Sequence, residues 1–316
     1  MSNLKTVIKN FYPLAYIIRK SKAVSVKGFS GLSIYDVVRF FVQQINKVGF
    51  NERAAAISFN LIQALPAMLL FLFSIVPYLP ASFNLQAAIL SLFKDLTPNS
   101  STYKLLVNVV NEILKKHIGI FSFGFILVMF YSSNAMIGII RTFDKSIAEK
   151  KKFFFHVRIR AIRLTLILML LIIVSMILMI GQNQMIGILK EFFHFKKNQF
   201  FYGWNIIRWL MIALITFSGI SIIYKFAPSV KERWKIISPG SILATTLTLL
   251  TTIGFSYWVK YFSNYNKIYG SIGTVLIVMV LIYLNSLILL IGFELNVSIT
   301  YLAEAKKKKY LQQEQV

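Results

Sequence analysis

The chain has 316 residues, of which 57% are hydrophobic, and its 35 Lys and Arg outnumber its 11 Asp and Glu to give a formal net charge of +24. Soluble domains contain about 45–50% apolar residues, so this composition argues against an ordinary soluble fold. The absence of cysteine from the sequence excludes a thiolate nucleophile, a disulfide and a cysteine-based metal site.

The apolar residues are concentrated in blocks of about 20 residues, the length of helix that crosses ~30 Å of membrane hydrocarbon. Lipid offers no partner to backbone amides, so such blocks must be helices or barrel strands, and they lack the alternating pattern of barrel strands. We therefore predict an all-α polytopic membrane protein with six transmembrane helices, at about residues 57–79, 118–140, 164–185, 205–226, 239–262 and 272–293.

Residues 1–50 are predicted to form a basic cytoplasmic segment that ends in an amphipathic helix over 33–48. Its apolar residues recur at helical spacing, and Ser33 with Asp36 resembles a capping box. The helix could lie on the inner leaflet with its apolar side in lipid, or it could pack on the core of the protein itself. The pattern leaves both arrangements open.

Two further amphipathic segments separate the first two spans. Residues 85–96 and 105–114 each carry apolar residues at helical spacing, and Pro98 breaks the chain between them. We predict two extramembrane helices here. The six-helix transmembrane domain is expected to cover residues 51–303, with a tight outer loop at 264–271, and a basic and polar cytoplasmic tail is expected to occupy 304–316.

The distribution of Lys and Arg predicts the orientation. Residues 1–53, 141–163, 225–235 and 306–309 hold 25 of the 35 basic residues, and they fall on one side of the predicted membrane. The positive-inside rule places these segments, and both termini, in the cytoplasm. The net charge then indicates a surface that faces anionic membrane lipids, which we expect as partners in preference to nucleic acid.

Several collinear blocks within residues 35–303 resemble the YihY/BrkB family of bacterial membrane proteins. They are residues 51–59 leading to Leu65-Pro66, the segment 131–134 followed by Arg141, Pro228 through Arg233-Trp234 to Pro239-Gly240, residues 269–273, and residues 292–296. Tyr131, Phe59-Asn60 and Phe293 depart from the family pattern. The resemblance implies a bacterial inner-membrane protein with six helices and both ends in the cytoplasm. Such proteins have been labelled ribonuclease BN, have been linked to virulence and serum resistance, and look transporter-like.

The sequence offers no catalytic, metal or cofactor site. His117, His156 and His194 have no carboxylate at ligand spacing, and the HExxH pattern and its relatives do not occur. We therefore expect no enzymatic activity, and the ribonuclease label has no support in the residues.

Glu294 is the only charged residue between Gly273 and Ala303, and charge inside a membrane is costly. It could be a buried carboxylate that faces a cavity and binds a cation or proton. It could also sit at the inner interface, where it caps a loop or pairs with a nearby Arg. Helical geometry places Asn285 and Asn296 together on nearly the opposite face, where we expect structural hydrogen bonds.

Other polar residues complete the candidate pathway. Asn134 and Arg141 follow one side of the second span, and Asp144 lies one turn beyond Arg141, within pairing distance. Tyr269 and Gly270 fall in the predicted outer turn, where glycine permits a tight reversal. These residues could line a polar path that ends at a cytoplasmic gate, or they could be packing and anchoring residues.

We therefore expect a transporter or flippase-like protein for a lipid or a small amphipathic solute. The alternative is a non-transporting structural or assembly factor of the cell envelope.

Overall fold

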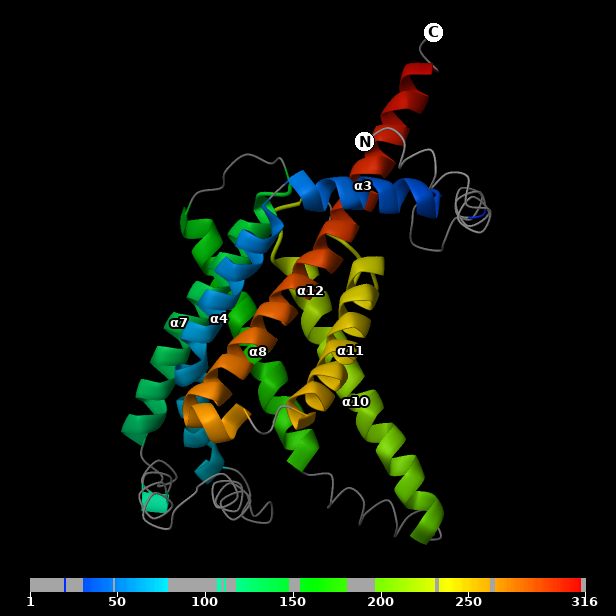
Figure 1. The fold of residues 1–316 in the computed structure, drawn as a ribbon. Helices are drawn as coiled ribbons and strands as arrows, with labels where there is room; N and C mark the ends of the chain where they lie inside the picture. Colours follow the sequence, from blue (N-terminus) through cyan, green and yellow to red (C-terminus); the bar gives the residue numbers. More distant parts are fainter. Residues whose placement is uncertain are drawn as a thin grey trace. The chain divides into compact units, whose positions relative to one another are not determined.

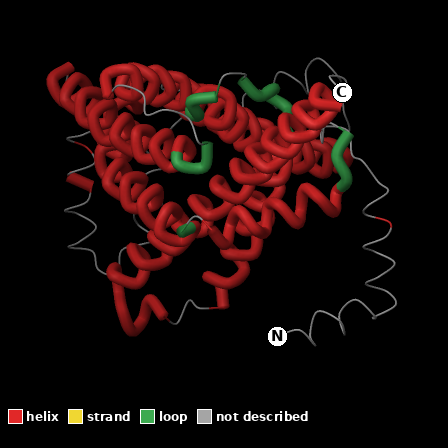
Figure 2. The backbone as a smooth tube through the Cα atoms, turned by 90° about the horizontal axis from the view of Figure 1, so that it is seen from above, coloured by secondary structure: helices red, strands yellow, loops and turns green. Residues whose placement is uncertain are grey.

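The structure is a computed structural model that describes residues 20, 31–47, 49–78, 107–108, 111, 118–147, 154–180, 197–230, 233–261 and 265–313. Within these residues every regular element is a helix, and no strand is assigned (Figures 1 and 2). The elements are α3 (Ile34–Lys47), α4 (Phe50–Ile75), the 3-10 turn η1 (Val76–Tyr78), α7 (Ile118–Asp144), α8 (Phe154–Ile180), α10 (Lys197–Phe226), α11 (Pro239–Tyr261) and α12 (Tyr265–Gln313).

Six of these helical segments are long and apolar enough to cross a membrane, and they confirm the predicted all-α polytopic class. They cover Phe50–Tyr78, Phe121–Asp144, His156–Leu178, Ile206–Phe226, Pro239–Val259 and Val275–Gln313. The protein is therefore a multi-pass membrane protein. The two amphipathic segments predicted at 85–96 and 105–114 lie outside the described residues, apart from positions 107, 108 and 111.

Four helices begin seven to ten residues earlier than the apolar blocks predict: α4, α8, α10 and α12. Helix α8 starts at Phe154, ten residues before the expected span, because a basic sequence outside the hydrocarbon can remain helical and arginine is a good helix former. Helix α12 starts at Tyr265, so the predicted loop at 264–271 is wrong for nearly all of its length and Tyr269 and Gly270 lie within a helix. The neighbouring Ile268 and Ile272 continue the apolar pattern, and no proline interrupts it.

Helix α12 also runs past the expected end of the last span, as far as Gln313. It is the longest described helix, and Figure 1 shows it as one continuous element. Lys306 to Lys309 therefore stand on exposed turns of this helix.

The chain divides into two compact units. Unit 1 contains residues 1–56, 141–150 and 220–316, and unit 2 contains residues 57–140 and 151–219. Helices α4, α7 and α10 each contribute one end to unit 1 and the remainder to unit 2.

In unit 1, α3 packs across α12 (Figure 1). Val37 of α3 and Leu32 are buried against Leu295 and Ile299, and the ring of Phe40 stacks on Tyr301 with centroids 5.1 Å apart. One apolar side of α3 is thus covered by the protein itself, while Val38 and Val42 on another side remain 49% exposed each. Of the two arrangements considered for this helix, the structure shows the one in which it packs on the protein itself. Its exposed valines can still contact lipid.

The turn between α3 and α4 depends on Gly49, whose φ of 55° lies in the left-handed region. This conformation is costly for residues with a Cβ atom. The amide of Arg53 donates to the carbonyl of Gly49 over 3.2 Å, so this turn sets where α4 begins and where the side chain of Arg53 is placed.

Unit 2 has its own apolar core between α4, α7 and α8. Ala67, Phe71 and Val128 are buried there, and partly buried side chains such as Phe121 and Ile173 pack around them. Aromatic contacts join α4 and η1 to α7, because Phe121 lies 5.7 Å from Phe71 and 5.3 Å from Tyr78, centroid to centroid. Pro66 lies inside α4, and the helix continues past it.

Candidate functional site

Arg53 lies in the first turns of α4 and is only 5% exposed. Its Nη1 donates to Oε1 of Glu294 over 2.8 Å, and its Nη2 donates to the carbonyl oxygen of Thr142 over 2.8 Å and to Oγ of Ser146 over 2.6 Å. The guanidinium therefore joins the start of α4 to the end of α7, to the turn that follows α7, and to the middle of α12. All four residues belong to unit 1.

Glu294 of α12 has no exposed surface. Its Oε1 accepts from Arg53 and also from the hydroxyl of Ser146, so that Ser146 bridges the two charged groups. Its Oε2 and the Nε of Arg53 have no hydrogen-bond partner among the described residues. The ion pair is thus end-on, whereas an Arg–carboxylate pair can form two parallel bonds. We call Arg53, Thr142, Ser146 and Glu294 the Arg53–Glu294 cluster.

Aromatic rings pack together at the sequence neighbours of this cluster. Phe143 and Phe293, the sequence neighbours of Thr142 and Glu294, stack with centroids 3.7 Å apart and planes 7° apart. Trp234 and Tyr224 complete the layer at 5.4 Å and 6.2 Å from Phe293. Phe293 departs from the family pattern noted above, and here its large ring is the centre of this aromatic layer.

Further polar contacts hold the loop after α10 in unit 1. The carboxylate of Asp144 accepts from the amide of Ser229 over 2.9 Å and from its hydroxyl over 3.0 Å. The indole of Trp234 donates to the hydroxyl of Thr300 over 3.0 Å. Asp144 therefore anchors this loop, and Arg141, one turn before it, is exposed.

Asn296 bonds α12 to the start of α11. Its Oδ1 accepts from the amide of Gly240 over 2.9 Å, and its Nδ2 donates to the hydroxyl of Ser238 over 3.0 Å. Asn285 instead donates to the carbonyl of Leu281, within its own helix. Asn296 therefore forms hydrogen bonds between two segments, and Asn285 forms a hydrogen bond within its own helix.

Asn134 belongs to unit 2, whereas the Arg53–Glu294 cluster belongs to unit 1. Its Oδ1 accepts from Nη1 of Arg158 of α8 over 2.5 Å, and the guanidinium of Arg158 lies 5.8 Å from the ring centroid of Phe130. The backbone of Tyr269 and Gly270 lies in the first turns of α12, within unit 1.

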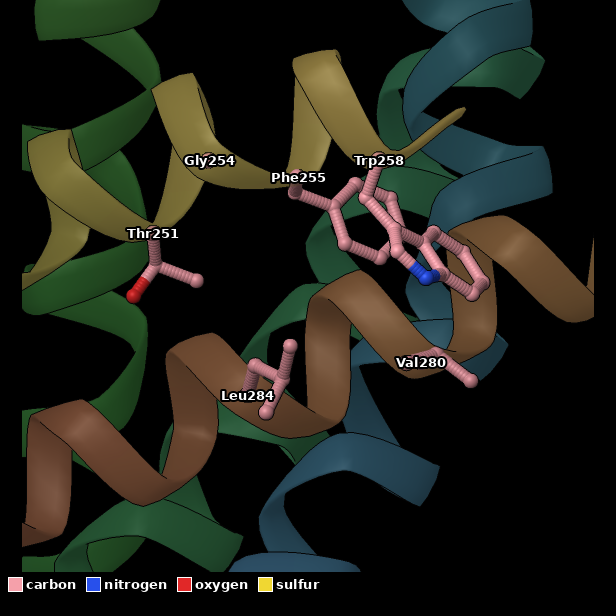
Figure 3. A pocket seen from close by; sticks show the side chains of 6 residues that line it. All are labelled: Thr251, Gly254, Phe255, Trp258, Val280 and Leu284. Carbon is pink, nitrogen blue, oxygen red and sulfur yellow. The ribbon is translucent and has the colours of Figure 1, made fainter. Parts of the chain in front are cut away.

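A pocket of about 390 Å³ lies between α11 and α12 in unit 1. Thr251, Gly254, Phe255 and Trp258 of α11 line one side, and Val280 and Leu284 of α12 line the other (Figure 3). The rings of Phe255 and Trp258 lie 5.4 Å apart. Nearly all of this lining is apolar, so the pocket suits a hydrocarbon group.

The sequence pointed to Glu294 but not to its partners. Among the described residues, no group of three or more His, Asp or Glu side chains is placed to hold a metal ion. His156 is exposed, and His117 and His194 lie outside the described residues. Arg53 stands 241 positions before Glu294 in the chain, and the only signal that could have singled it out is a charge directly at the start of an apolar block.

Comparison with known proteins agrees with this architecture. The family described as virulence factor BrkB matches residues 41–315. The ribonuclease-like protein YfkH of Bacillus subtilis is 28% identical over 247 residues, which cover 78% of this chain and 88% of YfkH. UPF0761 membrane proteins match more locally: that of Tolumonas auensis is 31% identical over 28% of this chain and 30% of its own length, and that of Pseudoalteromonas translucida is 34% identical over 27% and 29%.

No solved structure matches the chain. The family match covers most of the sequence and includes Arg53, Ser146 and Glu294. With six helices that are long and apolar enough to cross a membrane, the chain belongs to the virulence factor BrkB family of membrane proteins.

Proposed function

We propose that this chain is a transporter or flippase-like protein that moves a lipid or a small amphipathic solute through the bacterial inner membrane. The observation that carries the proposal is the buried, end-on ion pair between Arg53 and Glu294. A buried pair loses so much hydration that apolar residues of similar volume often stabilise a fold equally well or better. Ionisable groups kept inside membrane proteins commonly serve function.

In this proposal the Arg53–Glu294 cluster holds unit 1 in a closed state, and unit 1 opens when the contacts of the cluster break. The cluster joins three separate segments of unit 1 through one guanidinium, so a single displacement of the Arg53 side chain breaks all of these contacts. The unpaired Oε2 of Glu294 and Nε of Arg53 provide sites at which a proton or an anionic group can compete with the pair. A bidentate pair would resist such exchange more strongly.

The apolar pocket between α11 and α12 supports an amphipathic cargo. It is open to the surroundings of the helices, has a volume of about 390 Å³, and is lined almost entirely by apolar side chains. A Cβ atom on Gly254 would meet no atom within 4 Å, so this glycine borders open space that a hydrocarbon group can enter.

The distribution of charge supports an orientation with both termini in the cytoplasm. The natural chain has no cysteine, so single-cysteine variants can be labelled without background. We expect Tyr78→Cys, at the end of the first span, to react with a membrane-impermeant maleimide on intact cells. Glu304→Cys, exposed on α12, is expected to react only after permeabilisation. Labelling of Glu304→Cys from outside would contradict the orientation.

Reconstitution of the full chain into liposomes tests the transport proposal. The probes are a fluorescent phospholipid, whose inner-leaflet pool becomes accessible to a quencher when it is scrambled, and a trapped amphipathic dye. Wild-type protein is expected to exceed protein-free liposomes with at least one probe. Glu294→Gln is expected to raise that rate about tenfold. It weakens the contacts of the Arg53–Glu294 cluster, and a loss of ~1.4 kcal/mol corresponds to this factor.

Two variants sharpen the comparison. Gly254→Leu is expected to lower the rate, because its side chain occupies the pocket. Arg39→Gln removes an exposed arginine of α3 and is expected to leave the rate unchanged. If folded wild-type protein moves neither probe and Glu294→Gln does not change this, the transport proposal fails. The structural or assembly role in the cell envelope would then be the better account.

A further inference from the structure

Arg158 of α8 is a partly buried positive charge whose recorded partners are both neutral. It donates to the amide oxygen of Asn134 over 2.5 Å and lies 5.8 Å from the ring centroid of Phe130. The described residues of unit 2, at 57–78, 107–108, 111, 118–140, 154–180 and 197–219, contain no Asp or Glu. Within that part of the chain, nothing of opposite charge is available to Arg158.

This charge is partly buried in the basic first turns of α8, before the apolar block that begins at about residue 164. A charge that is partly withdrawn from water is costly unless it is paired or hydrogen-bonded. An amide oxygen and an aromatic face reduce the cost but leave the charge uncompensated. The environment of Arg158 therefore favours the binding of an anion.

A strip of exposed apolar side chains on α7 leads to this arginine. Phe123, Ile126 and Phe130 are 59%, 64% and 52% exposed, and with Asn134 they follow one another at intervals of three, four and four residues, which places them on one face of the helix. From position 123 to 134 the strip is about 16 Å long. One leaflet of a ~30 Å hydrocarbon layer has nearly the same depth, about 15 Å.

We propose that Arg158, Asn134 and the α7 strip of Phe123, Ile126 and Phe130 form a binding site for one anionic phospholipid. The phosphate binds the guanidinium of Arg158, and the amide NH₂ of Asn134 donates a second hydrogen bond. An acyl chain lies along the strip. Phosphate alone would gain nothing from the apolar strip, so the strip selects a phospholipid over a free anion. The site is independent of the proposed transport, because it requires binding only.

Native mass spectrometry of the full chain, released from neutral detergent, tests this site. Phosphatidylglycerol and phosphatidylcholine with identical acyl chains are added separately, and inorganic phosphate is added as a competitor. Wild-type protein is expected to retain one phosphatidylglycerol about fivefold more tightly than phosphatidylcholine, the preference that one basic side chain gives near an anionic lipid. Inorganic phosphate at matched concentration should not displace it.

Arg158→Gln is expected to abolish this preference, and Arg158→Lys to retain part of it. Phe130→Ala should weaken the binding of both lipids. Arg208→Gln, which removes an exposed arginine of α10 in the same unit, should keep the wild-type preference. An unchanged preference in a folded Arg158→Gln protein would overturn the site, as would displacement of the lipid by inorganic phosphate. If Arg158→Gln does not fold, the other two variants decide. The site would be overturned if Arg158→Lys showed no loss of preference and Phe130→Ala bound both lipids as the wild type does.

Discussion

Replacing Arg53 with alanine is expected to lower the free energy of unfolding by about 3–5 kcal/mol, the usual cost of removing one partner from a buried ion pair. Glu294 has no exposed surface and would retain its carboxylate without a counter-charge. The carbonyl of Thr142 would also lose its donor from Arg53. The measurement is denaturant unfolding of the purified protein in mixed detergent micelles.

Arg39→Ala is the matched control for this experiment. Arg39 is exposed on α3, and a surface substitution away from special features usually changes stability by less than about 0.5 kcal/mol. If Arg53→Ala behaves like Arg39→Ala, the guanidinium does not hold unit 1 together in the way the structure shows.

The second large effect is expected where α11 and α12 approach most closely. A Cβ atom on Gly292 would lie 2.4 Å from the hydroxyl oxygen of Tyr224, 2.5 Å from the carbonyl oxygen of Gly240 and 2.8 Å from Cβ of Ala244. Two of these neighbours are fixed by the backbone and cannot move without shifting a helix. The Tyr224 hydroxyl, which donates to the carbonyl of Leu289 over 2.7 Å, would also be displaced.

Gly292→Ala is therefore expected to destabilise the protein by about 1–3 kcal/mol, the usual cost of overpacking. Gly254→Ala in α11 is the control, because a Cβ atom there meets nothing within 4 Å. Alanine is a better helix former than glycine, so this control is expected to stabilise the protein by about 0.5–1 kcal/mol. The two glycine substitutions should thus act in opposite directions in the same unfolding assay. A stabilising Gly292→Ala would contradict the close packing of α11 on α12.

The helices could be predicted from the sequence because hydropathy and periodicity are local properties. Each membrane-spanning block displays its apolar length directly, and α3 displays its amphipathic spacing in 14 residues. The ends of the helices were less predictable. The start of α8 lies in a basic stretch and the start of α12 passes through Gly270, and composition alone does not distinguish an exposed helical turn from a loop.

The site was predictable only in part, because its partners are distant in sequence. Glu294 stood out as an isolated charge in an apolar block, and an ion pair with an arginine was one of the arrangements considered for it. The identity of Arg53 could not be inferred, since 241 positions separate the two residues. Asp144 was placed within pairing distance of Arg141, but no pattern in the sequence indicates that its carboxylate also binds Ser229, 85 positions later.

The most direct test of the central claim is the coupling free energy between positions 53 and 294. It is obtained from the unfolding free energies of the wild type, Arg53→Met, Glu294→Leu and the double variant. We predict a coupling of at least about 2 kcal/mol, with the double variant more stable than either single variant, because it buries no unpaired charge. Single effects that add to within about 0.5 kcal/mol would show that the two side chains do not interact, and would contradict the account.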